Sequence, residues 1–123
     1  MKMSNADFNE QLRRRTKDFA LKVIFLSNDL PRIESAKILA RQLVRSATSV
    51  AANFRSACRG RSKAEFFSKI CIVVEEADET QFWLEMLQDS NIVTDERISQ
   101  LHNEISQILA ITTTIKHKIQ SQQ

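Results

Sequence analysis

Apolar residues recur along this chain at steps of three, four or seven, a spacing that places them on one face of a helix. The pattern predicts four helices, which cover residues 7–29, 33–58, 63–89 and 95–119. The apolar positions of the fourth helix are Ile98, Leu101, Ile105, Ile108, Thr112, Ile115 and Ile119. This alternation of three and four is the seam of a left-handed bundle. Helices of this length with short links predict an all-α, up-down-up-down antiparallel four-helix bundle.

Several helix ends carry signals in the sequence. Ser62 and Glu65 form an S-x-x-E capping box, which predicts a helix start just after Ser62. Thr94 is predicted to cap the fourth helix, with Asp95 in its first turn, where the helix dipole favours a carboxylate. Gly60 is predicted to end the second helix in a left-handed conformation.

Composition supports the same fold class. With one glycine, one proline and no tyrosine in 123 residues, the chain is poor in the residues that sheets need for their turns. Its length favours one domain over residues 1–123. No apolar run approaches the roughly 20 residues that cross a bilayer, and the N-terminal residues lack the apolar segment of a signal peptide. We therefore expect no membrane association and a cytoplasmic location.

The third predicted helix is too apolar for a helix with one buried face. Its first half contains Phe66, Phe67, Ile70, Cys71, Ile72, Val73 and Val74. Further along, Phe82 and Trp83 point roughly 100° apart, so both cannot face one core. A second apolar face is typical of a partner surface, and we expect an oligomer. The alternative is that this helix is central to its own bundle.

Charged residues also occur where the second and third helices should face each other. If the two helices fold back around Gly60, Arg45 faces Glu76, and Arg41 lies level with Glu79. The predicted ion-pair network comprises Arg41, Gln42, Arg45, Asn53, Glu75, Glu76 and Glu79. Carboxylates beside a core are costly unless paired, so Arg45→Leu is expected to cost about 3–5 kcal/mol if the network is buried.

The residues of catalytic and metal sites are missing. Di-iron bundles use Glu-x-x-His, but the residues three before His102 and His117 are Ser99 and Thr114. There is also no glycine-rich phosphate loop, no Cys-x-x-Cys and no plausible nucleophile–base pair. We expect no metal, no cofactor and no enzymatic activity.

Charge is distributed unevenly along the chain. Residues 1–69 carry 15 basic and 6 acidic side chains, whereas residues 70–123 carry 3 basic and 9 acidic ones. The antiparallel connectivity gathers basic residues at one end of the bundle, namely Arg13, Arg14, Arg15, Lys17, Arg55, Arg59, Arg61 and Lys63. Arginine forks suit phosphate, so this basic end is predicted to bind nucleic acid. The alternative is a solvated surface that keeps the protein in solution.

A motif in the second helix indicates a family. The motif Q-L-x-R-(S/A)-x-x-S-(I/V)-x-x-N is matched by Gln42, Leu43, Arg45, Ser46, Ser49, Val50 and Asn53. On these residues the chain resembles bacterial four-helix-bundle proteins encoded in intervening sequences of large-subunit ribosomal RNA genes, over about Phe19 to Ile119. Ser56 and Ala57 stand where members usually carry Glu-Gly. The segments A-C-R-G-R-S-K-A-E-F and E-E-A-D-E-T-x-F-W-L-E are typical of a subgroup.

The resemblance implies a homopentamer with a central channel, in a family whose molecular role is not established. Accessory proteins of diversity-generating retroelements are similar in fold, and they are basic pentamers that bind reverse transcriptase and nucleic acid. We therefore expect a non-enzymatic homo-oligomer, in the first place a pentamer, that binds RNA or DNA through its basic end. A protein such as a reverse transcriptase is a further candidate partner. The alternative is a protein-interaction or scaffolding module with no nucleic-acid role.

Overall fold

The computed structural model describes residues 3–122, and this part of the chain contains four α-helices and no strand. Met1, Lys2 and Gln123, which belong to the predicted domain, lie outside the described residues. The helices are α1 (Asn5–Asn28), α2 (Glu34–Cys58), α3 (Lys63–Asp89) and α4 (Glu96–Gln120). Their bounds lie within one or two residues of the predicted ones, and the predicted all-α four-helix bundle is confirmed.

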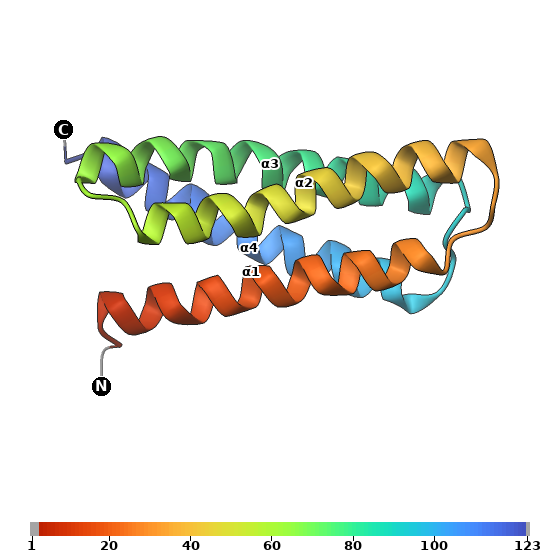
Figure 1. Cartoon of the computed structure of the whole chain (residues 1–123), viewed down its shortest axis with the longest axis horizontal. Helices are drawn as coiled ribbons and strands as arrows, with labels where there is room; N and C mark the ends of the chain where they lie inside the picture. The colour runs from red at the N-terminus through yellow and green to blue at the C-terminus, as the bar shows by residue number, and fades with distance from the viewer. Residues whose placement is uncertain (1–2, 123) are drawn as a thin grey trace.

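Each helix runs antiparallel to the one before it, and consecutive helices pack side by side (Figure 1). The two ends of the described chain and the α2–α3 link lie together at one end of the bundle (Figure 1). Contact is densest between α2 and α3 and sparsest between α1 and α4, which close the bundle. The basic end predicted from the connectivity is the end that holds the chain termini.

The core consists of one apolar face from each helix. The large side chains that are buried or nearly so are Leu12, Phe19, Val23 and Leu26 of α1, Leu43, Val50 and Phe54 of α2, Ile70, Val73, Leu84 and Leu87 of α3, and Ile98, Leu101, Ile105 and Ile108 of α4. Thr112 is also buried, and its hydroxyl donates a hydrogen bond to the carbonyl of Ile108 at 2.9 Å. A threonine therefore occupies a core position without leaving an unpaired donor. Phe8, near the start of α1, is exposed.

The capping residues agree with the sequence at α3 and differ at α4. The Ser62 hydroxyl accepts a hydrogen bond from the Glu65 N–H at 3.1 Å, as the capping box predicts. The Glu65 carboxylate accepts from the N–H of Arg61, one residue before the cap. The prediction that Thr94 caps α4 is wrong. Asp95 is the cap, and its carboxylate accepts from the N–H of Arg97 at 2.9 Å. A charged acceptor at this position also interacts favourably with the positive end of the helix dipole.

The left-handed backbone conformation occurs in the α3–α4 link, whereas it was predicted for Gly60 in the α2–α3 link. Gly60 does not have a positive φ, whereas Asn91, just after α3, has φ 61°. The N–H of Ile92 donates to the carbonyl of Leu87 at 3.2 Å, the bond that defines a Schellman motif. Gly60 lies in a crowded position instead, because a Cβ there would lie 3.1 Å from the carbonyl oxygen of Ala57.

The apolar first half of α3 is largely accounted for within one chain. Ile70 and Val73 are buried, and Phe66 and Val74 are partly buried against the core. The apolar side chains of Phe67, Cys71 and Ile72 are intermediate in exposure. The exposed apolar side chains of α3 are Phe82 and Met86, in its second half. Contacts with both α2 and α4 account for the buried residues of this half, and the most exposed large apolar side chains of α3 lie at the end far from the α2–α3 link.

Candidate nucleic-acid interface

A groove of about 610 Å³ lies between α1 and α2 and extends to the basic end of the bundle. Its cationic lining consists of Arg13, Arg14 and Lys17 from α1 and Arg55 and Arg59 from α2. We call it the α1–α2 groove. Residues four apart lie one above the other on a helix, so Arg13 and Lys17 share one side of α1, and Arg55 and Arg59 share one side of α2. Five of the eight residues predicted to bind nucleic acid are thus brought together.

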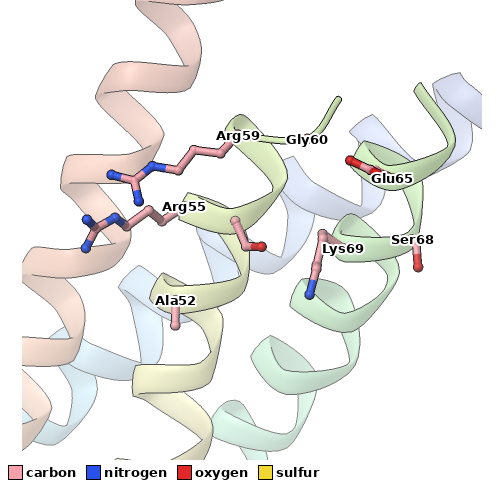
Figure 2. Close-up of a pocket in the computed structure, with 8 residues that line it drawn as sticks. Ala52, Arg55, Arg59, Gly60, Glu65, Ser68 and Lys69 are labelled. Atoms are coloured by element: carbon pink, nitrogen blue, oxygen red, sulfur yellow. The ribbon is translucent and has the colours of Figure 1, made fainter. Parts of the chain in front are cut away.

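A second hollow, of about 360 Å³, lies across α2 between its last turns and the start of α3. We call it the α2–α3 hollow. It shares Arg55 and Arg59 with the α1–α2 groove, and Lys69 of α3 lines its other side. Figure 2 shows Arg55 and Arg59 extending from α2 toward α1, while Lys69 lies on the side of α3. Arg55 and Arg59 therefore form a cationic ridge between the α1–α2 groove and the α2–α3 hollow.

Lys69 was not among the predicted binding residues. The predicted contact of Arg45 with Glu76 is present, and Arg45 also contacts Glu79, one turn further along α3. Lys69 lines the same hollow as Arg55. The basic character of Lys69 was available from the sequence, but its position beside the ridge depended on the register of two helices.

The α1–α2 groove contains one carboxylate, from Glu10, among the described residues that line it. Arg13 donates a hydrogen bond to this carboxylate, and Arg14 donates a second through its Nε at 3.0 Å. The bond from Arg13 is the main reason that the pKa of Glu10 lies below its ordinary value. Glu10 therefore stays ionised at neutral pH and neutralises part of the charge of α1. Within residues 3–122, Lys17, Arg55 and Arg59 form no ion pair with a carboxylate.

Arg15 faces a different surface. Its Nε and Nη2 donate to the two carboxylate oxygens of Glu104 on α4, both at 2.7 Å, and Nη2 also donates to Gln107 at 2.6 Å. The hydrogen bond with Arg15 lowers the pKa of Glu104 against the opposing effect of burial. This guanidinium is engaged in a bidentate pair between α1 and α4, so the structure separates Arg15 from the α1–α2 groove.

Arg61 and Lys63 line neither hollow. Arg61 is in the α2–α3 link, and Lys63 is the first residue of α3; both are exposed. They add positive charge around the basic end, where a polyanion would feel it at a distance.

The predicted ion-pair network is present in part and is not buried. Arg45 donates hydrogen bonds to Glu76 at 3.2 Å and to Glu79. The Nε of Arg45 also donates a long hydrogen bond of 3.4 Å to the side-chain oxygen of Gln42. The Trp83 indole N–H also donates to Glu79, at 3.2 Å. The Arg45 side chain is 47% exposed, because the pair lies at the rim of the α2–α3 interface. The expectation of a low-dielectric site is therefore wrong.

The remaining members of the network have other surroundings. Asn53 donates to the carbonyl and the hydroxyl of Ser49 on its own helix, both at 2.9 Å. Arg41 and Glu75 are exposed, and no ion pair involves them within the described residues. The buried polar contact between α2 and α3 is made instead by two hydroxyls, those of Ser46 and Thr80, at 2.8 Å. These hydroxyls are uncharged, so their burial carries a smaller desolvation cost than an ion pair.

Metal ligands are not gathered at either hollow. No group of three or more His, Cys, Asp or Glu residues that could hold a metal ion is found within residues 3–122. None of the helices in the same range is long and apolar enough to cross a membrane.

The fold and the groove define a class of protein, an all-α four-helix bundle with a cationic groove at the end that holds its termini. Within that class, the chain belongs to the 23S rRNA-intervening sequence protein family, whose model matches residues 9–114. This confirms the resemblance inferred from the helix motifs.

A similar solved structure is a protein with unknown function from the S23 ribosomal protein family of Bacteroides thetaiotaomicron. It shares 30% sequence identity with this chain and has a TM-score of 0.78, over 85% of this chain and 97% of that chain. Among curated proteins, none matches the sequence. The descriptions of the family and of this structure name no enzymatic activity.

Proposed function

We propose that this protein binds nucleic acid through the α1–α2 groove, without catalysing a reaction, and that it does so as a homo-oligomer. The observation that carries the proposal is the lining of the groove, in which five cationic side chains accompany one carboxylate. Four of the five are arginines, whose planar guanidinium groups match the geometry of phosphate. The cytoplasm remains the expected location.

The cations of the groove differ in how free they are to bind a phosphate. Arg13 and Arg14 already share Glu10, so a phosphate must compete with that carboxylate. Lys17, Arg55 and Arg59 have no carboxylate partner among residues 3–122, and they are exposed. We therefore assign the largest part of the binding free energy to these three, acting through release of counterions from the nucleic acid.

The test replaces Lys17, Arg55 and Arg59 together by glutamine and measures binding of a generic structured RNA at low and moderate salt. We expect the affinity at low salt to fall by about tenfold or more, and the slope of log affinity against log salt to decrease by about 2. Circular dichroism and light scattering of the variant check that the fold and the assembly are unchanged.

A matched control removes the same number of charges at the other end of the bundle. Arg32, Lys37 and Arg41 are exposed near the α1–α2 link, and all three become glutamine. This variant should retain most of the affinity at moderate salt, because Arg41, the nearest of the three on α2, lies roughly 21 Å along the helix from Arg55, beyond the Debye length of about 10 Å at 0.1 M salt. Equal losses in the two variants, or no RNA binding by the unmodified protein at low salt, would refute the proposal.

The homo-oligomer is supported by exposed apolar side chains on one face of α2 and α3. Because Arg45 contacts Glu79, Ile38 and Met86 lie at the same level two turns further along the pair of helices. Phe82 lies about one turn before Met86 on α3 and is 49% exposed. We call Ile38, Phe82 and Met86 the apolar patch. Its burial against other copies would remove from water side chains that the single bundle leaves uncovered.

Light scattering tests the assembly, with an expected mass near five times the 14.2 kDa of one chain. Phe82→Asp should shift the mass toward the monomer, because a charge would be buried at the interface. Phe25→Asp is the control, since Phe25 is exposed on α1 outside the apolar patch. A monomeric unmodified protein at micromolar concentration would contradict the oligomer and leave the groove proposal intact.

The apolar patch also supports a second candidate function, a protein-interaction or scaffolding module. In that case a protein partner, such as a reverse transcriptase, would cover the patch. The second candidate is favoured if the protein is monomeric and RNA binding is absent at low salt.

A further inference from the structure

The α1–α2 groove has two halves with different chemistry. The half near the chain termini is cationic and contains the arginines and Lys17. The other half is lined by Leu21 and Ile24 of α1 and by small residues of both helices, chiefly Ala20, Ala51 and Ala52. Leu21 is 40% exposed. Apolar side chains therefore stand open to solvent directly beside the phosphate-binding cations.

We propose that this groove takes an unpaired nucleic-acid strand, whose phosphates contact the cationic half and whose bases lie against the apolar half. The inference rests on the proposed function and adds the class of nucleic acid. In a duplex the faces of the bases are stacked and covered, so only phosphates, sugars and base edges reach a protein. The bases of a single strand can be splayed out and placed on apolar or guanidinium surfaces.

The path of the cations fits a chain-like ligand. Arg55 and Arg59 border both the α1–α2 groove and the α2–α3 hollow, and Lys69 adds a positive charge on the far side, which also contains the carboxylate of Glu65. From Arg13 to Ile24, α1 rises by roughly 16 Å, at about 1.5 Å per residue. A strand can cross the ridge between the hollows and follow the groove over this length, whereas a single phosphate group would use only a part of it.

An acidic amphipathic helix is the other occupant that matches a cationic and apolar groove. Such a helix is held by apolar anchors repeated at i, i+3 or i+4, and i+7, each of which needs a pocket. Leu21 and Ile24 are the only apolar side chains larger than alanine that line this groove within the described chain. Two residues on one wall do not provide a row of such pockets, so the observations favour the strand.

The experiment compares a labelled 12-nucleotide pyrimidine RNA, which cannot pair with itself, with a duplex of the same length. Leu21→Ser should weaken binding of the single strand by about threefold to tenfold, the effect of losing apolar contact with one base, and should change duplex binding by less than twofold. Leu21→Phe should strengthen binding of the single strand, because an aromatic ring can stack on a base. Circular dichroism checks that both Leu21 variants keep the fold.

Two further variants complete the comparison. Phe25→Ser is the matched control, because Phe25 is an exposed apolar residue of α1 that lines a different hollow, and it should leave both affinities unchanged. Arg55→Gln with Arg59→Gln should weaken binding of both ligands. Unchanged single-strand binding in both Leu21 variants would overturn the inference while duplex binding upholds the proposed function. The inference would also be overturned if the Leu21 substitutions changed the affinity for an acidic amphipathic peptide and left the affinity for the single strand unchanged. If the unmodified protein binds neither the single strand nor the duplex at low salt, both the inference and the proposed function are overturned.

Discussion

Arg14 and Arg15 are adjacent in the sequence but lie on different surfaces, and this predicts opposite effects of the same substitution. Arg15→Gln removes the bidentate pair with Glu104 between α1 and α4. Arg14→Gln removes a charge that lines the α1–α2 groove. We expect the first change to lower stability and preserve nucleic-acid binding, and the second to weaken binding and preserve stability.

The expected stability changes follow from geometry and exposure. The Arg15–Glu104 pair has two parallel bonds of 2.7 Å, and the two side chains are 33% and 31% exposed. Exposed ion pairs contribute about 0.2–1 kcal/mol, and hydrogen bonds to charged groups contribute about 1.5–3 kcal/mol when well shielded. A pair between these limits should contribute about 1–2 kcal/mol, or roughly 3–8 °C in Tm. The Arg14 side chain is 76% exposed and pairs within its own helix, so its loss should cost at most about 0.5 kcal/mol.

The contribution of the Arg15–Glu104 pair should depend on pH. Arg15 holds the pKa of Glu104 below its ordinary value of 4.5 in the folded protein. A carboxyl whose pKa is lowered by folding stabilises the protein fully above its unfolded pKa, and it loses that effect as the pH falls through the folded pKa. The stability difference between the unmodified protein and Arg15→Gln should therefore be constant near neutral pH. It should shrink as the pH falls below about 4.5.

Urea unfolding followed by circular dichroism measures the stability differences, with all proteins at one concentration because assembly contributes to stability. Fluorescence anisotropy with a labelled RNA measures binding. If Arg15→Gln leaves the urea midpoint unchanged, or if it weakens RNA binding as much as Arg14→Gln does, the assignment of Arg15 to the α1–α4 contact is refuted.

Two further changes test other features of the bundle. Arg45→Leu should lower the free energy of unfolding by about 0.5–1.5 kcal/mol, which is less than the loss of a buried ion pair would cost, because Arg45 is half exposed. A urea midpoint that indicates a loss above about 3 kcal/mol would contradict this. Gly60→Ala should destabilise by about 1 kcal/mol, because the added methyl group meets the Ala57 carbonyl oxygen at 3.1 Å. Calorimetry that shows equal or higher Tm would mean that the α2–α3 link moves freely to make room.

Much of the fold could be predicted because the local signals agree with one another. The apolar period, the Ser62–Glu65 capping box and the scarcity of glycine and proline each indicate long helices, and the helix bounds were correct within one or two residues. The errors occurred where two acceptable residues compete. Asp95 caps α4 in place of Thr94, and Asn91 adopts the left-handed conformation that was assigned to Gly60. Both asparagine and glycine tolerate that conformation, so residue type alone does not choose the link.

The candidate site could be predicted only to the level of one end of the bundle. Connectivity places the start of α1 beside the end of α2, so the gathering of Arg13, Arg14, Lys17, Arg55 and Arg59 follows from the order of the helices. Which side chains share a surface depends on the rotation of each helix about its axis. One residue step turns a side chain by about 100°, which is enough to send Arg15 to α4 while Arg14 faces the groove.

The amino-acid sequence by itself determined four amphipathic helices, their order and the concentration of positive charge at one end, because these depend on local spacing and on connectivity. The tertiary structure decided the register of α2 against α3, the exposure of Arg45 and the open apolar half of the α1–α2 groove. These features arise from the packing of several helices at once. The close contacts of a dense core fix the rotation and separation of every helix together, and no single segment of the sequence carries that information.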